Sequence, residues 1–161
     1  MNNILLRPVN DHDAPFLASI INTDTILHAL NELPTTLVDW ADAISAWHQD
    51  DDEEDYIICH GQTPIGWLGI NGLASENKTA YLKLIALFPD FHSKGIGEYV
   101  INQMIDALKK RSYFTLSLYT DQNNLKARAC YKKCGFEVTE AFSEIMANGK
   151  SVARCKMERR L

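Results

Sequence analysis

A strand, a glycine-containing loop and a helix follow one another between Tyr81 and Arg111, and this unit constrains the fold more than any other part of the chain. The run from Tyr81 to Phe88 is apolar enough for a buried strand, and Pro89 ends it. A strand that leads through a tight loop into an amphipathic helix predicts a chain of mixed α/β class. The helix is expected from about Gly95 to Arg111, because apolar residues recur there at helical spacing: Ile96, Val100, Ile101, Met104, Ile105 and Leu108.

The loop that joins this strand to the helix has the sequence His92-Ser93-Lys94-Gly95-Ile96-Gly97. Its glycines let another molecule approach the backbone closely, and the first N–H groups of a helix are unpaired and carry the positive end of its dipole. A dinucleotide fingerprint would need a third glycine at Val100, and a P-loop would need Gly-Lys-Ser or Gly-Lys-Thr. The loop alone therefore favours an anion site and a glycine-containing turn without a ligand about equally.

A second segment, Asn124 to Phe136, decides between these interpretations. Its residues have the spacing Asn-x-x-Ala-x-x-x-Tyr-x-x-x-Gly-Phe. Together with the run from Pro89 to Gly97, this segment resembles the GNAT superfamily of acetyl-coenzyme A dependent N-acetyltransferases. The family's loop has the form Pro-x-x-Gln/Arg-x-x-Gly-x-Gly, so His92 departs from the commonest residues at its position.

Composition predicts a single domain over residues 1–161, and the resemblance implies that this is an N-acetyltransferase domain. A chain of 161 residues, 46% of them apolar, can bury one sizeable core but hardly two. Near Met1 there is no basic segment followed by a long apolar run, and no window could span a membrane, so we expect a cytoplasmic protein without a membrane partner. The net charge of −5 and the lack of a basic stripe argue against a nucleic-acid partner.

The four cysteines lack the paired spacing of zinc sites, and we expect no metal. In the cytosol they would stay reduced. Cys130 and Cys134 lie one helical turn apart, which could indicate a metal or redox pair, but no histidine or further cysteine is close to them in sequence. Two small buried side chains are the favoured interpretation.

The apolar patterns predict alternating strands and helices. Thr36 to Asp39 resembles a capping box that starts a helix, His28 to Pro34 is predicted to be a loop, and Asn148-Gly149 is predicted to form a type I′ hairpin turn. The resemblance implies an α+β fold, with a mixed, largely antiparallel sheet of about seven strands, splayed between the fourth and fifth, and about four helices. The expected strands are Ile4 to Val9, Tyr56 to Cys59, Ile65 to Leu73, Ala80 to Phe88, Phe114 to Tyr119, Glu137 to Met146 and Ser151 to Glu158.

The resemblance also implies that acetyl-coenzyme A (acetyl-CoA) is the cosubstrate. Its diphosphate would lie at the head of the helix, on backbone N–H groups and the side chains of the loop. Its pantetheine arm would pair with the end of the preceding strand, as an added strand does. The implied cofactor-binding residues are Ile85, Ala86, Leu87, His92, Ser93, Lys94, Gly95, Ile96, Gly97, Glu98, Asn124, Ala127 and Tyr131.

Two of these residues would be catalytic in the family. The backbone N–H of Leu87 would stabilise the oxyanion that forms when an amine attacks the thioester. The hydroxyl of Tyr131 would act on the departing thiolate, as a hydrogen-bond donor or as an acid. Tyr131 could instead be an aromatic residue on the core face of its helix, and Asn124 could be only the N-cap of that helix.

The acceptor is expected to be a primary amine, on a small molecule such as an aminoglycoside, polyamine or amino acid, or at a protein N-terminus. The resemblance implies that the acceptor pocket is flanked by the region from His28 to Trp47 and by the final hairpin around Phe142 to Lys150. Glu32, Trp40 and Tyr81 are the candidate acceptor-binding residues. Trp40 could form an aromatic wall with Trp47 and Trp67, although each is more often a core residue. Some family members carry a glutamate base at the position that aligns with Tyr81. Here Glu76, Glu32, Asp90 or a water relay could take that role.

Two alternatives stay open. Cys130 or Cys134 could carry the acetyl group covalently, although no histidine and carboxylate partners accompany them. The chain could also be a sensor of the same fold that binds acyl-coenzyme A without turnover. Monomers and homodimers both occur in the family, and the sequence favours neither.

Overall fold

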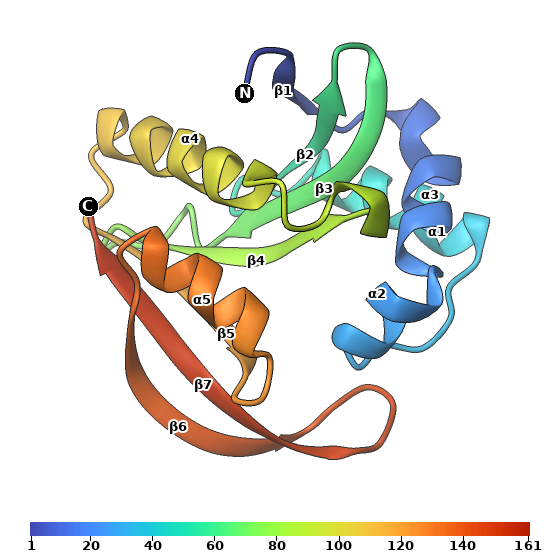
Figure 1. Ribbon diagram of the computed structural model, residues 1–161. Coiled ribbons are helices and arrows are strands. Elements are labelled where there is room, and N and C mark those ends of the chain that lie inside the picture. Colours follow the sequence, from blue (N-terminus) through green and yellow to red (C-terminus); the bar gives the residue numbers. More distant parts are fainter.

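A sheet of seven strands forms the centre of the computed structural model, which describes residues 1–161 (Figure 1). The strands lie in the order β1-β2-β3-β4-β5-β7-β6, and every neighbouring pair is antiparallel except the parallel pair β4 and β5. The predicted mixed, largely antiparallel sheet is therefore confirmed. Its strands are β1 (Ile4–Pro8), β2 (Glu54–His60), β3 (Thr63–Asn71), β4 (Thr79–Leu87), β5 (Thr115–Asp121), β6 (Glu137–Ile145) and β7 (Ser151–Arg160).

Five α-helices accompany the sheet, where about four were expected. They are α1 (Ala14–Ile21), α2 (Asp24–Ala29), α3 (Leu37–Trp47), α4 (Ile96–Lys110) and α5 (Leu125–Lys133). The unexpected helix is α2, and His28, which was predicted to begin a loop, lies in its last turn. With six residues, of which only Ile26 is buried, α2 is too short to show a helical period in the sequence. None of the helices has the length and apolar character needed to cross a membrane.

The helices divide between the two faces of the sheet, and each face has its own core. Helices α4 and α5 lie in front of the sheet in Figure 1. Helix α4 shares a cluster of 22 buried residues with the sheet, including Ile58 and Val100, and α5 packs against this cluster with the partly buried Cys130 and Tyr131. On the opposite face, α1 and α3 share a cluster of 12 buried residues that includes Leu17, Ile44 and Ile57. Ile57 and Ile58 are neighbours in β2 but belong to different cores, because successive side chains of a strand point to opposite faces.

Strands β4 and β5 separate along their length. Backbone pairing joins only Thr79 to Tyr81 of β4 with β5, and beyond Tyr81 the two strands diverge. A bulge bends β4 at the same level, since Leu82 and Leu84 pair with adjacent residues of β3 and leave Lys83 without a partner. The predicted splay between the fourth and fifth strands is confirmed. It leaves one edge of β4 open along its second half.

The turn between β6 and β7 differs from the predicted one. A type I′ turn needs a positive φ at both Asn148 and Gly149, but of these two only Gly149 has one, at 81°. The N–H of Gly149 donates to Met146 O at 2.8 Å, and the N–H of Met146 donates to Lys150 O at 2.9 Å. The loop thus has three residues, with Gly149 in the left-handed position after a tight turn, a pattern that also requires glycine.

Candidate active site

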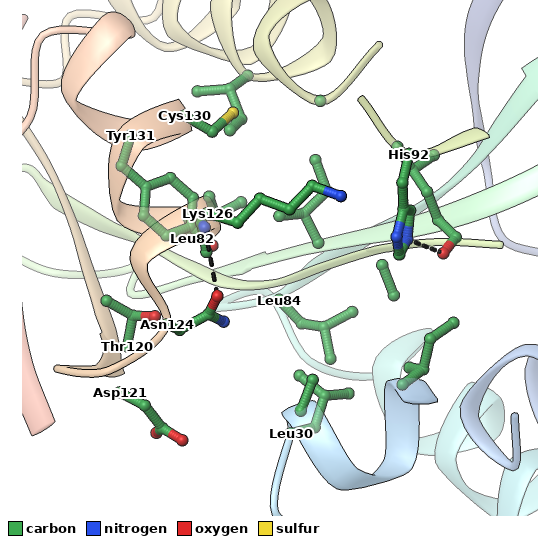
Figure 2. Close-up of a pocket in the computed structure, with 18 of the residues that line it drawn as sticks. Leu30, Leu82, Leu84, His92, Thr120, Asp121, Asn124, Lys126, Cys130 and Tyr131 are labelled. Atoms are coloured by element: carbon green, nitrogen blue, oxygen red, sulfur yellow. Dashed lines mark hydrogen bonds between the residues drawn. The ribbon is translucent and has the colours of Figure 1, made fainter. Parts of the chain in front are cut away.

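A cavity of about 770 Å³ lies where β4 and β5 diverge (Figure 2). Its walls come from β4 and the loop after it, from the first turn of α4, from the end of β5, and from α5, while α2 closes one end. This volume is typical of sites for small molecules. The cavity brings together all but one of the predicted cofactor-binding positions, the exception being Lys94: Ile85, Ala86, Leu87, His92, Ser93, Gly95, Ile96, Gly97, Glu98, Asn124, Ala127 and Tyr131.

The loop before α4 presents a continuous row of unpaired backbone donors. The N–H of His92 donates to Pro89 O, and the next N–H with a backbone acceptor is that of Tyr99, which donates to Gly95 O at 3.0 Å. The six N–H groups from Ser93 to Glu98 have no acceptor within the protein. Ser93 and Gly95 have positive φ angles of 59° and 75°, which turn successive N–H groups toward one side. Together with the dipole of a 15-residue helix, this row favours an anion.

His92 does not offer its ring to an anion in the way expected. Its Nε2 lies 2.7 Å from the carbonyl oxygen of Leu87, the last residue of β4. Because a carbonyl can only accept a hydrogen bond, Nε2 carries the proton and donates it. The ring therefore fixes the loop to the end of β4, and Figure 2 shows this bond at the edge of the cavity. At the position where the family most often has glutamine or arginine, this chain has a residue that holds the loop in place.

Four cationic residues that line the cavity were not predicted as binding residues: Lys83, Lys126, Lys133 and Arg154. Lys126 extends from α5 across the cavity toward the loop of His92 (Figure 2), and it forms no ion pair. The predicted Lys94 instead lies with its Nζ 5.6 Å from the centre of the Phe91 ring. Only the position of Lys126 inside the Asn-x-x-Ala motif could have indicated it from the sequence.

The open edge of β4 presents unpaired backbone groups to the cavity. The N–H of Phe88 donates to Ile65 O on β3 at 3.0 Å. Neighbouring residues of a strand point their N–H groups to opposite edges, so the N–H groups of Leu87 and Ile85 point away from β3, into the gap left by β5. The carbonyl of Leu87 is already bound to His92, and its N–H is free for a ligand.

Tyr131 lies on α5 with its ring against Phe136, the two ring centres being 6.1 Å apart. Its hydroxyl lines the cavity and has no hydrogen-bond partner within the protein. Burial raises the pKa of Tyr131 well above the ordinary phenol value, and the thiols of Cys130 and Cys134 raise it further. The phenol therefore keeps its proton throughout the neutral range and is a hydrogen-bond donor there.

Asn124 is the N-cap of α5, as the sequence allowed. Its Oδ1 accepts the N–H of Ala127 at 3.3 Å, while its Nδ2 has no partner and faces the cavity (Figure 2). Thr120, at the end of β5, was not predicted: it is only 7% exposed, lines the cavity and has no partner for its hydroxyl. Cys130 also lines the cavity, and a hydrogen bond from Cys134 lowers its pKa to about 7.

The end of the cavity near α2 is closed by a set of polar contacts. Asn31, at a φ of 55°, donates from Nδ2 to Asp121 Oδ2 at 2.8 Å. Arg154 of β7 donates from Nη1 to the other carboxylate oxygen of Asp121, also at 2.8 Å. The backbone N–H of Asn148 in the β6–β7 turn donates to Asn31 O at 3.3 Å. Three segments that are distant in sequence are thus joined at this end, and the predicted Glu32 lines the cavity beside them.

The other two predicted acceptor residues do not line the cavity. Trp40 is 8% exposed and packs edge-on against Trp67, with ring centres 5.3 Å apart, in the core beneath α1 and α3. Trp40 is therefore a core residue, the more common role of a tryptophan, and not part of an aromatic wall of the acceptor pocket. Tyr81 lies outside the lining as well, with its ring stacked on Tyr119 at 6.0 Å, and of this pair only Tyr119 reaches the cavity.

The core tryptophans are tied to the bulge of β4 by the buried Asp55 and the partly exposed side chain of Lys83. The indole N–H of Trp67 donates to Asp55 Oδ1 at 2.7 Å, and Lys83 Nζ lies 3.2 Å from the same oxygen and 4.5 Å from the centre of the Trp47 ring. Burial raises the pKa of Asp55 to about 7 and lowers that of Lys83 to about 8. This network holds β2, β3 and α3 against the bulge and so fixes the level at which β4 leaves β5.

Comparison with known proteins decides the family. Residues 22–136 match the model of the acetyltransferase (GNAT) family. The chain belongs to the GNAT acetyltransferase family. An uncharacterized N-acetyltransferase of Methanocaldococcus jannaschii is 30% identical to this GNAT protein over 106 residues, which are 63% of the chain and 47% of the relative. The chain thus spans less than half the length of that curated relative.

Solved structures share the fold of this GNAT protein at low sequence identity. A spermidine N-acetyltransferase from Vibrio cholerae, in complex with CoA and spermine, has a TM-score of 0.89 at 20% identity, covering 99% of this chain and 96% of that one. A ribosomal L7/L12 alpha-N-protein acetyltransferase in complex with CoA has a TM-score of 0.89 at 18% identity, covering 100% and 96%. The microcin C7 self-immunity acetyltransferase, in complex with acetyl-CoA and AMP, has a TM-score of 0.86 at 21% identity, covering 100% of this chain and 94% of that one. These similarities show the GNAT fold for the whole chain.

Proposed function

We propose that the protein transfers the acetyl group of acetyl-CoA to a primary amine by direct attack of the amine on the thioester. The observation that carries the proposal is the row of six free N–H groups, Ser93 to Glu98, in the same cavity as the unpartnered hydroxyl of Tyr131. Relatives of the same fold support it, since their structures contain CoA with spermine, or acetyl-CoA with AMP.

In this proposal the diphosphate of the cofactor accepts hydrogen bonds from the head of α4. A helix N-terminus with several free N–H groups binds phosphate through its dipole and its donors together. Lys126 adds a positive charge from the opposite wall, and Ser93 adds its hydroxyl. His92 holds the loop in place through its bond to Leu87 and does not itself bind phosphate through Nε2.

The pantetheine arm then extends along the open edge of β4. Its amides would pair with the free backbone groups of Ile85 and Leu87, as an added strand pairs with a sheet edge. The arm also passes the side-chain amide of Asn124, whose Nδ2 is free. This path leads from the phosphate site toward the wall that carries Tyr131.

Attack of the amine forms a bond from nitrogen to the thioester carbon and places negative charge on the carbonyl oxygen. The free N–H of Leu87 points into the gap between β4 and β5 and would donate to that oxygen. One such donor contributes about 3 kcal/mol to transition-state stabilisation. Because the donor belongs to a strand held by the sheet, it needs no reorganisation during the reaction.

Collapse of the intermediate breaks the bond between carbon and sulfur and releases the thiolate of CoA. The hydroxyl of Tyr131 would donate a hydrogen bond to this sulfur. Full proton transfer from a phenol to a thiolate of pKa about 8.5 is uphill even at the ordinary phenol pKa of about 10, and burial raises the pKa of Tyr131 further. Hydrogen bonding is therefore its main contribution, and a solvent proton completes the thiol.

The attacking amine must lose a proton, and water in the cavity would carry it away. Tyr81 stands where some family members have their glutamate base. Glu158, at the same level of the sheet, is paired with Lys156 and does not line the cavity. Asp121 is occupied by Asn31 and Arg154. A covalent route through Cys130 is not favoured, because the one histidine that lines the cavity, His92, is bound to Leu87 O and forms no hydrogen bond with the sulfur. All four cysteines are free, and we place the reaction in the reducing cytoplasm.

Release of free thiol from acetyl-CoA, measured with a panel of amines, tests the proposal. We expect release that depends on the amine and a stoichiometric N-acetyl product in mass spectra. A sensor of the same fold would bind acetyl-CoA in calorimetry yet release no thiol with any amine, and this outcome would overturn the proposal. Acetyl label that stays on the protein after the cofactor is removed would favour the covalent route instead.

Substitution of Lys126 with glutamine is expected to weaken CoA binding about tenfold at low salt, because one charge-assisted contact to phosphate is lost. The loss should shrink as salt screens the charge. Lys132→Gln is the matched control, since Lys132 lies on the same helix but does not line this cavity. Calorimetry at two salt concentrations measures both variants, and equal affinities would contradict the placement of the diphosphate beside Lys126.

A further inference from the structure

The end of the cavity near α2, which we call the acceptor end, has a charge opposite to that of the phosphate loop. The acceptor end comprises Glu32, Asp121 and Arg154, which line the cavity, with Glu144 beside Arg154. Three carboxylates there face a single guanidinium. Arg154 donates to Asp121 at 2.8 Å and lies 3.2 Å from Glu144, so it is shared between two of them. The acceptor end is therefore left with an excess of negative charge.

Glu32 is the carboxylate without a partner. It is exposed, and no lysine, arginine or histidine nitrogen lies within ion-pair distance of it. The lysines of β4 and β7 are already engaged, Lys83 with Glu53 and Asp55, and Lys156 with Glu158. The unpaired Lys126 extends away toward the loop of His92, and Lys150 of the β6–β7 turn does not line the cavity. In a cleft with low-dielectric walls, charges of one sign reinforce one another and attract a cation.

The acceptor end is also held in place by hydrogen bonds between distant segments. Asn31 is 8% exposed and bonds to Asp121, and the β6–β7 turn bonds to Asn31 in turn, so these carboxylates are held by contacts from three segments. Thr120 is only 7% exposed and directs a hydroxyl without a protein partner into the cavity, as Figure 2 shows. A hydroxyl at the cavity surface without a protein partner is open to a hydrogen bond with a ligand.

We infer that the preferred acceptor carries a second cationic group besides the amine that is acetylated. This inference rests on the proposed function. That group is bound at the acceptor end by Glu32 together with the Asp121 and Glu144 carboxylates, while Thr120 accepts a hydrogen bond from an ammonium N–H. The acceptor class is thus a diamine or polyamine. An α-amino acid is disfavoured, because its carboxylate would face three others and the only guanidinium is already engaged.

Pairs of amines with equal carbon chains test this inference. Putrescine and butylamine, cadaverine and pentylamine, and hexanediamine and hexylamine each differ by one terminal ammonium group. We expect kcat/KM, from thiol release with acetyl-CoA, to favour the diamine at least about tenfold in the best pair, as one cleft-bound ion pair predicts. The preference should decline at high ionic strength.

Two variants and a control test whether the carboxylates of the acceptor end bind the second cationic group. Glu32→Gln and Glu144→Gln should each reduce the ratio of diamine to monoamine kcat/KM at least about threefold. Glu76→Gln removes the same charge from an exposed turn outside the cavity and should leave that ratio as it is. Thermal unfolding of each variant verifies that it is folded.

The outcomes separate this inference from the proposed function. Equal efficiency for monoamine and diamine in all three pairs, or a preference for an α-amino acid, overturns the inference and leaves amine acetylation intact. If no amine in the panel causes release of thiol, both the inference and the proposed function are overturned. A diamine preference that persists unchanged in both glutamine variants would also overturn the inference, because the cation would then be bound elsewhere.

Discussion

Substitution of Gly97 with valine is expected to weaken CoA binding by about 30-fold or more while the protein stays folded. Gly97 is in the first turn of α4, its N–H is free, and it lines the cavity. A larger side chain there would hold the diphosphate away from the helix head. The loss of one charge-assisted hydrogen bond costs about 2 kcal/mol, which corresponds to about 30-fold in affinity. Isothermal titration with CoA measures the effect.

A graded series at Gly97 separates a steric effect on the ligand from damage to the protein. A methyl group added at this position would meet only Cys130 Sγ, at 3.7 Å, which is an ordinary contact. Gly97→Ala should therefore leave the unfolding temperature unchanged or higher, because alanine favours the helix, and its loss of affinity should be smaller than that of valine. Affinity that is unchanged in the valine variant would contradict the phosphate site at α4.

Substitution of Tyr131 with phenylalanine is expected to lower kcat about 100-fold, while the affinity for CoA changes less than about threefold. The ring keeps its contact with Phe136, so only the hydroxyl is lost. A donor aimed at charge that develops in the transition state typically contributes this much to the rate, and it contributes little to binding of the ground state. Steady-state kinetics with saturating amine, together with calorimetry, measure the two quantities.

Tyr99→Phe is the matched control for this substitution. Tyr99 is partly buried on α4 and does not line the cavity, so loss of its hydroxyl should leave kcat within about twofold of the parent. The pH profile adds a second readout. Because burial raises the pKa of Tyr131, its deprotonation should not limit the rate below about pH 10. Full activity of Tyr131→Phe would contradict the role given to the hydroxyl. An alkaline limb below about pH 10 that disappears in this variant would contradict the raised pKa of Tyr131.

The local parts of the fold could be predicted because their causes lie within a few residues of sequence. The capping box of Thr36 and Asp39, the amphipathic face of α4 and the N-cap at Asn124 all follow from neighbours along the chain. The β6–β7 turn shows the limit of such reasoning. Asn-Gly favours a two-residue turn, but the register of β6 and β7 leaves three residues in the loop, and Gly149 takes the left-handed position alone.

The parts of the site that could not be predicted depend on contacts between distant segments. Asn31 and Asp121 meet across 90 positions of sequence, and nothing near either residue indicates the other. His92 was expected to face an anion, but its donor is bound to Leu87, and this depends on how the loop folds back onto β4. Trp40 was a candidate for the acceptor pocket, since a tryptophan at a helix start is equally suited to a pocket wall and to a core. Its burial against Trp67 appears only once α3 is placed on the sheet.

A structure of the protein with bound acetyl-CoA tests the central claim most directly. We predict diphosphate oxygens within hydrogen-bond distance, about 3 Å, of N–H groups between Ser93 and Glu98, and the thioester sulfur at a similar distance from the Tyr131 hydroxyl. The thioester oxygen should accept the N–H of Leu87. A cofactor whose diphosphate lies away from the head of α4, or whose sulfur lies beyond hydrogen-bond reach of Tyr131, would contradict the account.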